Sequence, residues 1–142
     1  MRQNIYFIII ILTLLIPVMG QKVCLDPGHG GSDPGAVGCG LEEADVVMEV
    51  VNYMKSKFSS SGYNVYLTRS SDVYVSLSSR TSYANSISAS YFISVHCNAF
   101  NGSAHGTETY CYTNGSSTSF SMRNNINPKV VEALSTHNRG CK

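Results

Sequence analysis

The order of short apolar runs and helical stretches predicts an α/β fold, a three-layer sandwich in which helices flank a largely parallel sheet. Three observations lead to this prediction. Several runs rich in β-branched and aromatic residues are short enough to be strands. Stretches with helical spacing of apolar residues separate the first three of these runs, as expected for parallel strands joined by helices. The chain has 142 residues, which suffices for one small domain.

The elements follow in a regular order. The first strand is expected over residues 22–26, and the stretch rich in Gly and Pro after it must be a loop. The first helix is expected over residues 43–58, because its apolar residues share one face and its first turn is acidic, which suits the helix dipole. The other expected elements are strands over residues 63–69, 91–95 and 107–112, a helix over 76–89 capped by Ser76, and a helix from Ser116 to His137 interrupted near Pro128.

The two ends of the chain differ from this domain. Residues 1–20 have the pattern of a secretory signal, with the basic Arg2, an apolar run, and a small residue, Gly20, at the expected cleavage point. An uncleaved anchor is the alternative reading, and either reading places the domain, residues 21–142, outside the cell membrane. The last helix leads only to NRGCK, so we expect no further strand and a domain that is incomplete at its C-terminus.

Charge and cysteine content narrow the class of protein. The chain has 10 basic and 9 acidic residues and a formal net charge of +1, which gives no electrostatic reason to expect binding to nucleic acid or to an anionic membrane. Five cysteines in an exported chain predict one or two disulfides, of a connectivity that the sequence leaves open. None of the cysteines forms a C-x-x-C pair, which argues against a cysteine zinc site.

Two histidines and a glutamate predict a metal site. His29 follows the first expected strand and His96 follows the third, so both should lie at the carboxyl edge of the sheet, where open α/β folds build their sites. Glu43 lies at the start of the first helix. Two imidazoles and one carboxylate are the protein ligands of a catalytic zinc, which keeps a fourth position for water. Asp26, Asn98 or backbone carbonyls are candidates to orient the histidine rings.

Each of these residues also has a simpler explanation. A histidine at the end of a strand can be a surface residue, and Glu43 suits the N-terminus of a helix without any metal. Two other kinds of site can be set aside. The GHGGSDPG loop lacks the ending of a phosphate-binding P-loop. Cys97 adjoins His96, but neighbouring strand residues point to opposite faces and cannot readily form a catalytic pair. Asp33 is interpreted as a turn residue.

Five segments together resemble one enzyme family. LDPGHGGSDPGAVG, GLEEADVVMEVV, VYLTRSSDVYVSLSSRTSYAN, FISVHCNAF and GTETYCY are similar, in order and spacing, to zinc-dependent N-acetylmuramoyl-L-alanine amidases of the Amidase_3 type. The resemblance extends from about Val23 to the last residue, and it implies a phosphorylase/hydrolase-like sandwich. It also implies the zinc ligands His29, Glu43 and His96. Glu43 is preferred to the adjacent Glu42 because Ala44-Asp45 matches the pair that follows the family's ligand.

The resemblance implies roles for other residues as well. Arg69, Asp72 and Arg80 match recurrent positions, for which we expect a scaffolding role that holds loops in place. In this family the general base is a glutamate on a later strand near the C-terminus, and the corresponding continuation after NRG is absent. Glu108 is a weak candidate to replace it, and Glu132 a weaker one.

The implied function is that of a secreted hydrolase of the cell wall. Its cofactor would be Zn²⁺, and its substrate the amide between N-acetylmuramic acid and L-alanine in peptidoglycan. The location would be extracellular, periplasmic or in the cell wall. The alternative is a catalytically impaired peptidoglycan-binding or regulatory domain that keeps the zinc pocket. A third reading is a secreted domain held by disulfides, with no metal. The oligomeric state is left open.

Overall fold

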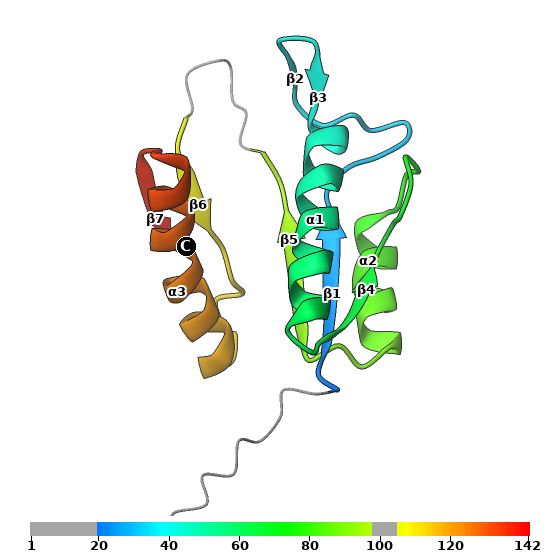
Figure 1. The fold of residues 1–142 in the computed structure, drawn as a ribbon, viewed down its shortest axis with the longest axis vertical. Helices are drawn as coiled ribbons and strands as arrows, with labels where there is room; N and C mark the ends of the chain where they lie inside the picture. The colour runs from blue at the N-terminus through cyan, green and yellow to red at the C-terminus, as the bar shows by residue number, and fades with distance from the viewer. Residues whose placement is uncertain (1–19, 98–104) are drawn as a thin grey trace, which may run out of the picture.

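The computed structural model describes residues 20–97 and 105–142 (Figure 1), so the expected signal sequence up to residue 19 lies outside the described residues. In chain order the elements are β1 (Lys22–Pro27), β2 (Val37–Gly38), β3 (Leu41–Glu42), α1 (Glu43–Ser60), β4 (Asn64–Leu67), α2 (Leu77–Ser86), β5 (Tyr91–Val95), β6 (Thr107–Thr109), α3 (Ser117–Leu134) and β7 (Asn138–Cys141).

The central sheet has three parallel strands in the order β4-β1-β5. β1 lies in the middle and is buried along almost its whole length, which explains why its sequence is a nearly continuous apolar run. Val23 of β1 aligns with Val65 of β4 and with Tyr91 of β5, so all three strands end at the same edge. The parallel sheet predicted from the sequence is confirmed.

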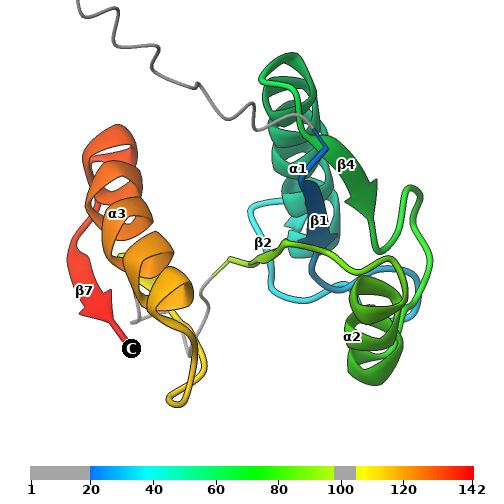
Figure 2. The same cartoon turned by 90° about the horizontal axis from the view of Figure 1, so that it is seen from below.

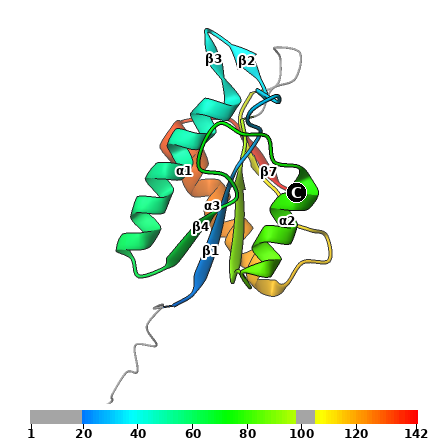
Figure 3. The same ribbon diagram turned by 90° about the vertical axis from the view of Figure 1, so that its right-hand side faces the viewer.

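Helices cover both faces of this sheet. α1 and α2 lie on opposite sides of β1, as the two turned views show (Figures 2 and 3). Val51 of α1 packs with Val23 and Leu25 of β1 in the buried core, and partly buried residues of β4 and β5 surround them. α2 begins as predicted, because the Ser76 side chain accepts a hydrogen bond from the backbone N–H of Ser79. These layers confirm the α/β sandwich.

The C-terminal part forms a second, smaller sheet beside β5 (Figures 1 and 2). β6 and β7 pair in parallel, and α3 connects them. The expectation of no further strand after the last helix is therefore wrong. Ser135, in the left-handed conformation (φ 50°), ends α3 and turns the chain back, so that Asn138–Cys141 lies along β6. The polar NRGC segment gave no strand signal, because its pairing comes from the fold and not from apolar alternation.

α3 continues through Pro128, where the sequence predicted an interruption. Proline removes one backbone hydrogen bond from a helix, but packing can offset that loss. The preceding residue, Asn127, is buried and connects the helix to both strands. Its side chain accepts a hydrogen bond from Thr109 of β6 and donates one to Asn138 of β7.

The loop after β1 contains a hairpin that the sequence reading missed. β2 and β3 pair antiparallel, and the turn between them uses Cys39 and Gly40, both with positive φ. The expectation of disulfides is also wrong, since all five cysteines are described and all are free thiols. Buried Cys24 lies in β1 and exposed Cys39 lies at the hairpin tip, so the cysteines are spread over different elements.

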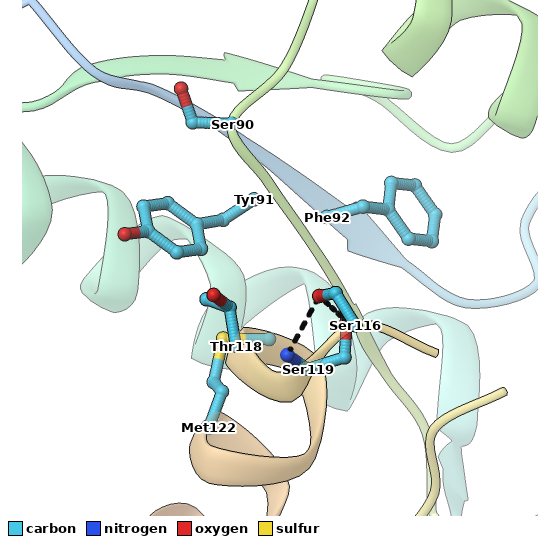
Figure 4. Close-up of a pocket in the computed structure, with 7 residues that line it drawn as sticks. All are labelled: Ser90, Tyr91, Phe92, Ser116, Thr118, Ser119 and Met122. Atoms are coloured by element: carbon cyan, nitrogen blue, oxygen red, sulfur yellow. Dashed lines mark hydrogen bonds between the residues drawn. The ribbon is translucent and has the colours of Figure 1, made fainter. Parts of the chain in front are cut away.

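The surface of the described residues contains a cleft outside the candidate site. This cleft of about 420 Å³ lies between β5 and the first turns of α3 (Figure 4). It is lined by Ser90, Tyr91, Phe92, Ser116, Thr118, Ser119 and Met122, and none of the candidate site residues borders it. Within residues 20–97 and 105–142, no helix has the length and apolar character needed to cross a membrane.

Candidate metal centre

His29 lies two residues after the end of β1 and is held in an unusual backbone conformation. The N–H of Gly28 continues the sheet by donating to the Val95 carbonyl at 3.0 Å. His29 then takes a positive φ of 58°, which turns its side chain out of the strand direction. Arg80 stabilises this turn, because its Nη2 donates to the His29 carbonyl at 2.8 Å.

Glu43 is positioned by the contact between α1 and the loop before it. The first N–H of the helix, that of Glu43, donates to the Ala36 carbonyl at 2.8 Å, and the next, that of Ala44, donates to the Pro34 carbonyl. The Glu43 carboxylate accepts backbone hydrogen bonds from Ala36 at 3.0 Å and from Cys97 at 2.7 Å. Burial alone would raise the pKa of Glu43, but these N–H donors and the two histidines outweigh it and lower the pKa.

The structure brings His29, Glu43 and His96 together. Oε1 of Glu43 lies 3.1 Å from Nε2 of His29 and 3.1 Å from Nδ1 of His96, and these two nitrogens are also 3.1 Å apart. Ligand atoms of a tetrahedral zinc with bonds of about 2.0–2.2 Å stand about 3.3 Å apart, so the three atoms fit one such ion. Among the described residues this is the only group of three or more His, Cys, Asp or Glu side chains close enough to hold a metal.

The same geometry distinguishes Glu43 from its neighbour. Glu42, in β3, is exposed, and it is not part of the three-residue group. The Glu43 side chain is only 3% exposed, whereas that of His96 is 46% exposed. The three ligand atoms therefore lie at the surface end of a buried carboxylate, with His96 facing solvent. This leaves one side of the group accessible to water or substrate.

The residues around the two histidines differ from the expectation. Asp26 does not orient a histidine ring, because its carboxylate is occupied by Arg80 at 2.7 Å and by the hydroxyls of Thr68 and Ser94. Asp33, interpreted as a turn residue, instead lies 2.9 Å from Nδ1 of His29. Asn98 lies outside the described residues.

Arg69 and Arg80 are both buried and hold the loop that carries His29. Nη2 of Arg69 donates to the carbonyls of Gly28 at 2.7 Å and Ala44 at 2.9 Å, so a single guanidinium joins the residue before His29 to the residue after Glu43. Burial, followed by the nearby Arg80 charge, lowers the pKa of Arg69.

Arg80 forms an ion pair with Asp26 and also donates to the Pro27 carbonyl. Asp72 accepts the Gly31 N–H on the same loop at 2.6 Å. The contacts of these residues are those of a scaffold. The sequence alone could not show that backbone carbonyls, and not carboxylates, are the main partners of Arg69.

Two other candidates are not members of the group. Glu108, on β6, forms an ion pair with Arg139 of β7 at 3.2 Å, and it is not among the three clustered side chains. Cys97 contacts the group through its backbone, and burial, together with the Glu43 charge, raises the pKa of its thiol. A raised pKa disfavours the nucleophilic thiolate, in agreement with the sequence argument against a Cys97 nucleophile.

Comparison with known proteins identifies one enzyme family. Residues 23–142 match the family described as Amidase_3: N-acetylmuramoyl-L-alanine amidase. The chain is 37% identical over 123 residues to the sporulation-specific N-acetylmuramoyl-L-alanine amidase of Bacillus subtilis, covering 85% of this chain and 48% of that protein. It is 38% identical over 128 residues to the N-acetylmuramoyl-L-alanine amidase LytC of the same organism, covering 89% of this chain and 26% of that protein.

A solved structure identifies the same kind of enzyme. The crystal structure of N-acetylmuramoyl-L-alanine amidase from Clostridium difficile 630 superposes with a TM-score of 0.80 and 28% identity, covering 86% of this chain and 68% of that one.

The chain spans only part of its curated relatives. It covers about half the length of the first B. subtilis relative and about a quarter of the second.

Proposed function

Because the chain belongs to the Amidase_3 family of N-acetylmuramoyl-L-alanine amidases, we propose that it is a secreted, zinc-dependent hydrolase of peptidoglycan. The proposed reaction cleaves the amide bond between the lactyl group of N-acetylmuramic acid and L-alanine of the stem peptide. The two B. subtilis relatives, both N-acetylmuramoyl-L-alanine amidases, support this substrate. The signal-like residues 1–20 support export to the cell wall or beyond.

The single observation that carries the proposal is the spacing of three ligand atoms, 3.1 Å apart in each pair, from His29, Glu43 and His96. Zinc bound there would polarise the scissile carbonyl and make water more acidic. The chain's own residues would supply the geometry. Glu43 enters the site already ionised and fixed by two N–H donors, which suits a ligand that must be deprotonated.

The proposed mechanism also requires a general base. Hydrolysis needs a group that accepts the proton of water and returns it to the leaving amine. Glu43 is itself a member of the three-residue group. Among the other described carboxylates, Asp33 contacts the group, and it already accepts a hydrogen bond from His29. Glu108 is engaged with Arg139. This observation favours a second candidate function, a domain that binds zinc and peptidoglycan but hydrolyses it slowly, since a general base contributes about 10²–10⁴-fold.

One experiment separates the two candidates. The purified mature chain is loaded with zinc and incubated with a soluble muramoyl peptide, and the products are identified by mass. Release of glycan and peptide, with the combined mass of substrate plus one water, supports the hydrolase. Retention on insoluble peptidoglycan without release supports the binding domain.

The metal requirement has its own control. His29→Ala and His96→Ala should each lose bound zinc, measured by elemental analysis of protein purified without chelator. His137→Ala is the matched control, because this histidine is outside the three-residue group. Unchanged zinc content in both site variants would remove both candidate functions.

A further inference from the structure

We propose that Asp33 is the positioning residue of the metal centre, fixing the His29 ring in the one tautomer that can bind metal beside Glu43. Oδ2 of Asp33 lies 2.9 Å from Nδ1 of His29. An ionised carboxylate only accepts hydrogen bonds, so Nδ1 carries a proton. Nε2, which lies 3.1 Å from Glu43 Oε1, is then the nitrogen left to bind a metal, and without metal it can donate to that carboxylate. The inference rests on the proposed metal site for its consequence, but the proton on Nδ1 needs no metal.

The loop holds the Asp33 carboxylate in place without help from His29. The backbones of Gly30 and Asp33 exchange two hydrogen bonds, at 2.7 and 3.2 Å, which close the turn. The second oxygen of Asp33 accepts the Gly35 N–H at 3.2 Å. Because the turn is closed by backbone atoms, replacing the Asp33 side chain should leave the path of the loop largely intact.

Gly35 completes the support on the other side of the ring. A β-carbon at Gly35 would lie 2.6 Å from Cδ2 of His29 and 2.9 Å from the β-carbon of Glu43. The His29 ring therefore packs directly against this backbone, while Asp33 accepts a hydrogen bond from Nδ1. The packing limits the orientation of the ring, and the hydrogen bond to Asp33 holds a proton on Nδ1.

Other carboxylates nearby cannot take this role. The carboxylate of Asp26 is occupied by Arg80, Thr68 and Ser94. Asp72 accepts a hydrogen bond from the Gly31 N–H of the same loop at 2.6 Å, and not from His29. Asp72 is thus a matched control: the same side chain, on the same loop, with a backbone hydrogen bond and no bond to a proposed ligand.

The test compares Asp33→Ala, Asp33→Asn and Asp72→Ala. The tautomer of His29 is read in the metal-free protein at neutral pH from long-range ¹H–¹⁵N correlations of ring nitrogens, and zinc affinity is read by competition with a chelating dye. We expect Nδ1 of His29 to be protonated in wild type, whether or not Nε2 carries a second proton that it donates to Glu43. In Asp33→Ala the proton on Nδ1 should be lost in favour of Nε2, and zinc affinity should fall by about 10–100-fold, typical of losing an outer partner of a metal-binding histidine.

The other two variants make the result specific. Asp33→Asn keeps an oxygen that can accept from Nδ1–H, so it should restore most of the tautomer preference and of the affinity. Asp72→Ala should leave the tautomer unchanged and the affinity within about threefold of wild type. The proposal is overturned if Asp33→Ala retains the wild-type tautomer, or if Asp72→Ala shifts it equally. If wild type binds no zinc, the proposed function fails, and the tautomer measurement still decides the role of Asp33.

Discussion

The ring of His96 lies directly against the backbone of Gly28, so that a β-carbon on Gly28 would be 2.3 Å from Cε1 and 2.6 Å from Nδ1 of His96. No side chain fits in that space. Gly28 also donates its N–H to Val95, the residue before His96. The ends of β1 and β5 are therefore joined closely enough for the two histidines to share an ion only because residue 28 is glycine.

The first prediction concerns this contact. Gly28→Ala should displace the His96 ring and lower zinc affinity by at least about tenfold, comparable with changes in the groups that orient metal ligands. Gly28 does not have a positive φ, so the effect is steric and not a strain of the backbone. Chelator competition measures the affinity, and circular dichroism checks the fold. Gly38→Ala is the control, because a β-carbon there would meet nothing within 4 Å; equal affinities in the two variants would contradict the prediction.

The second prediction separates the two adjacent glutamates. Glu43→Gln should lose zinc by more than the roughly 10–100-fold typical of an outer partner, because a ligand charge is removed. It should also destabilise the loop contacts, since the amide group has a single acceptor oxygen for the N–H groups of Ala36 and Cys97. Glu42→Gln should leave zinc binding unchanged, because Glu42 is exposed. Isothermal titration with zinc tests both, and a larger loss in Glu42→Gln would transfer the ligand role to that residue.

The third prediction concerns the guanidinium that joins both ligand-bearing segments. Arg69→Lys keeps the charge but cannot donate at once to the carbonyls of Pro27, Gly28 and Ala44, which Arg69 reaches at 3.0, 2.7 and 2.9 Å. Leaving buried carbonyls without donors should reduce the free energy of unfolding by roughly 2–4 kcal/mol. Urea unfolding of the metal-free protein measures it.

The control for Arg69 is Arg123→Lys. Arg123 donates to the Lys142 carbonyl at 2.9 Å in an exposed contact, so its replacement should change the free energy of unfolding by less than about 0.5 kcal/mol. Similar losses in the two variants would show that the buried network around Arg69 is not what holds the loop.

The convergence of the three proposed ligands could be predicted from sequence because their positions in the fold follow from simple rules. His29 and His96 follow two strands that become neighbours in a parallel sheet, and Glu43 begins the helix whose first turn lies at the same edge. The partners of these ligands could not be predicted in the same way. Asp33 reaches His29 only because His29 takes a positive φ, and no pattern of apolar residues encodes that conformation.

The C-terminal part contains a strand that the sequence pattern could not predict. β7 has a polar sequence and contains Gly140 with a φ of +88°, features that argue against a strand. It becomes a strand because α3 returns the chain alongside β6, where backbone hydrogen bonds are available. Buried Asn127 connects the helix to both strands, and a buried amide at a helix centre is likewise invisible to hydrophobic periodicity.

The last prediction uses Cys24 in the middle of β1, whose side chain is fully buried. Burial, and secondly the charge of Asp26, raises the pKa of this thiol from 9.0 to about 11. The unfolded chain therefore releases the thiol proton at lower pH than the folded protein does. The associated stability is complete below pH 9 and is lost as the pH rises toward about 11, reaching a loss of about 2 kcal/mol near pH 10.5.

Cys24→Ala isolates this contribution from the lysines and tyrosines that titrate in the same range. The variant should be less stable at pH 8, because a buried sulfur is removed, but its free energy of unfolding should fall less steeply between pH 8 and 10.5 than that of wild type. Cys39→Ala, at the exposed hairpin tip, should retain the wild-type slope. Parallel slopes for wild type and Cys24→Ala would mean that the thiol ionises equally readily in both states. A buried sulfur next to Asp26 would then have to be reached by water, which is incompatible with the closed packing of β1 between β4, β5 and the two helices.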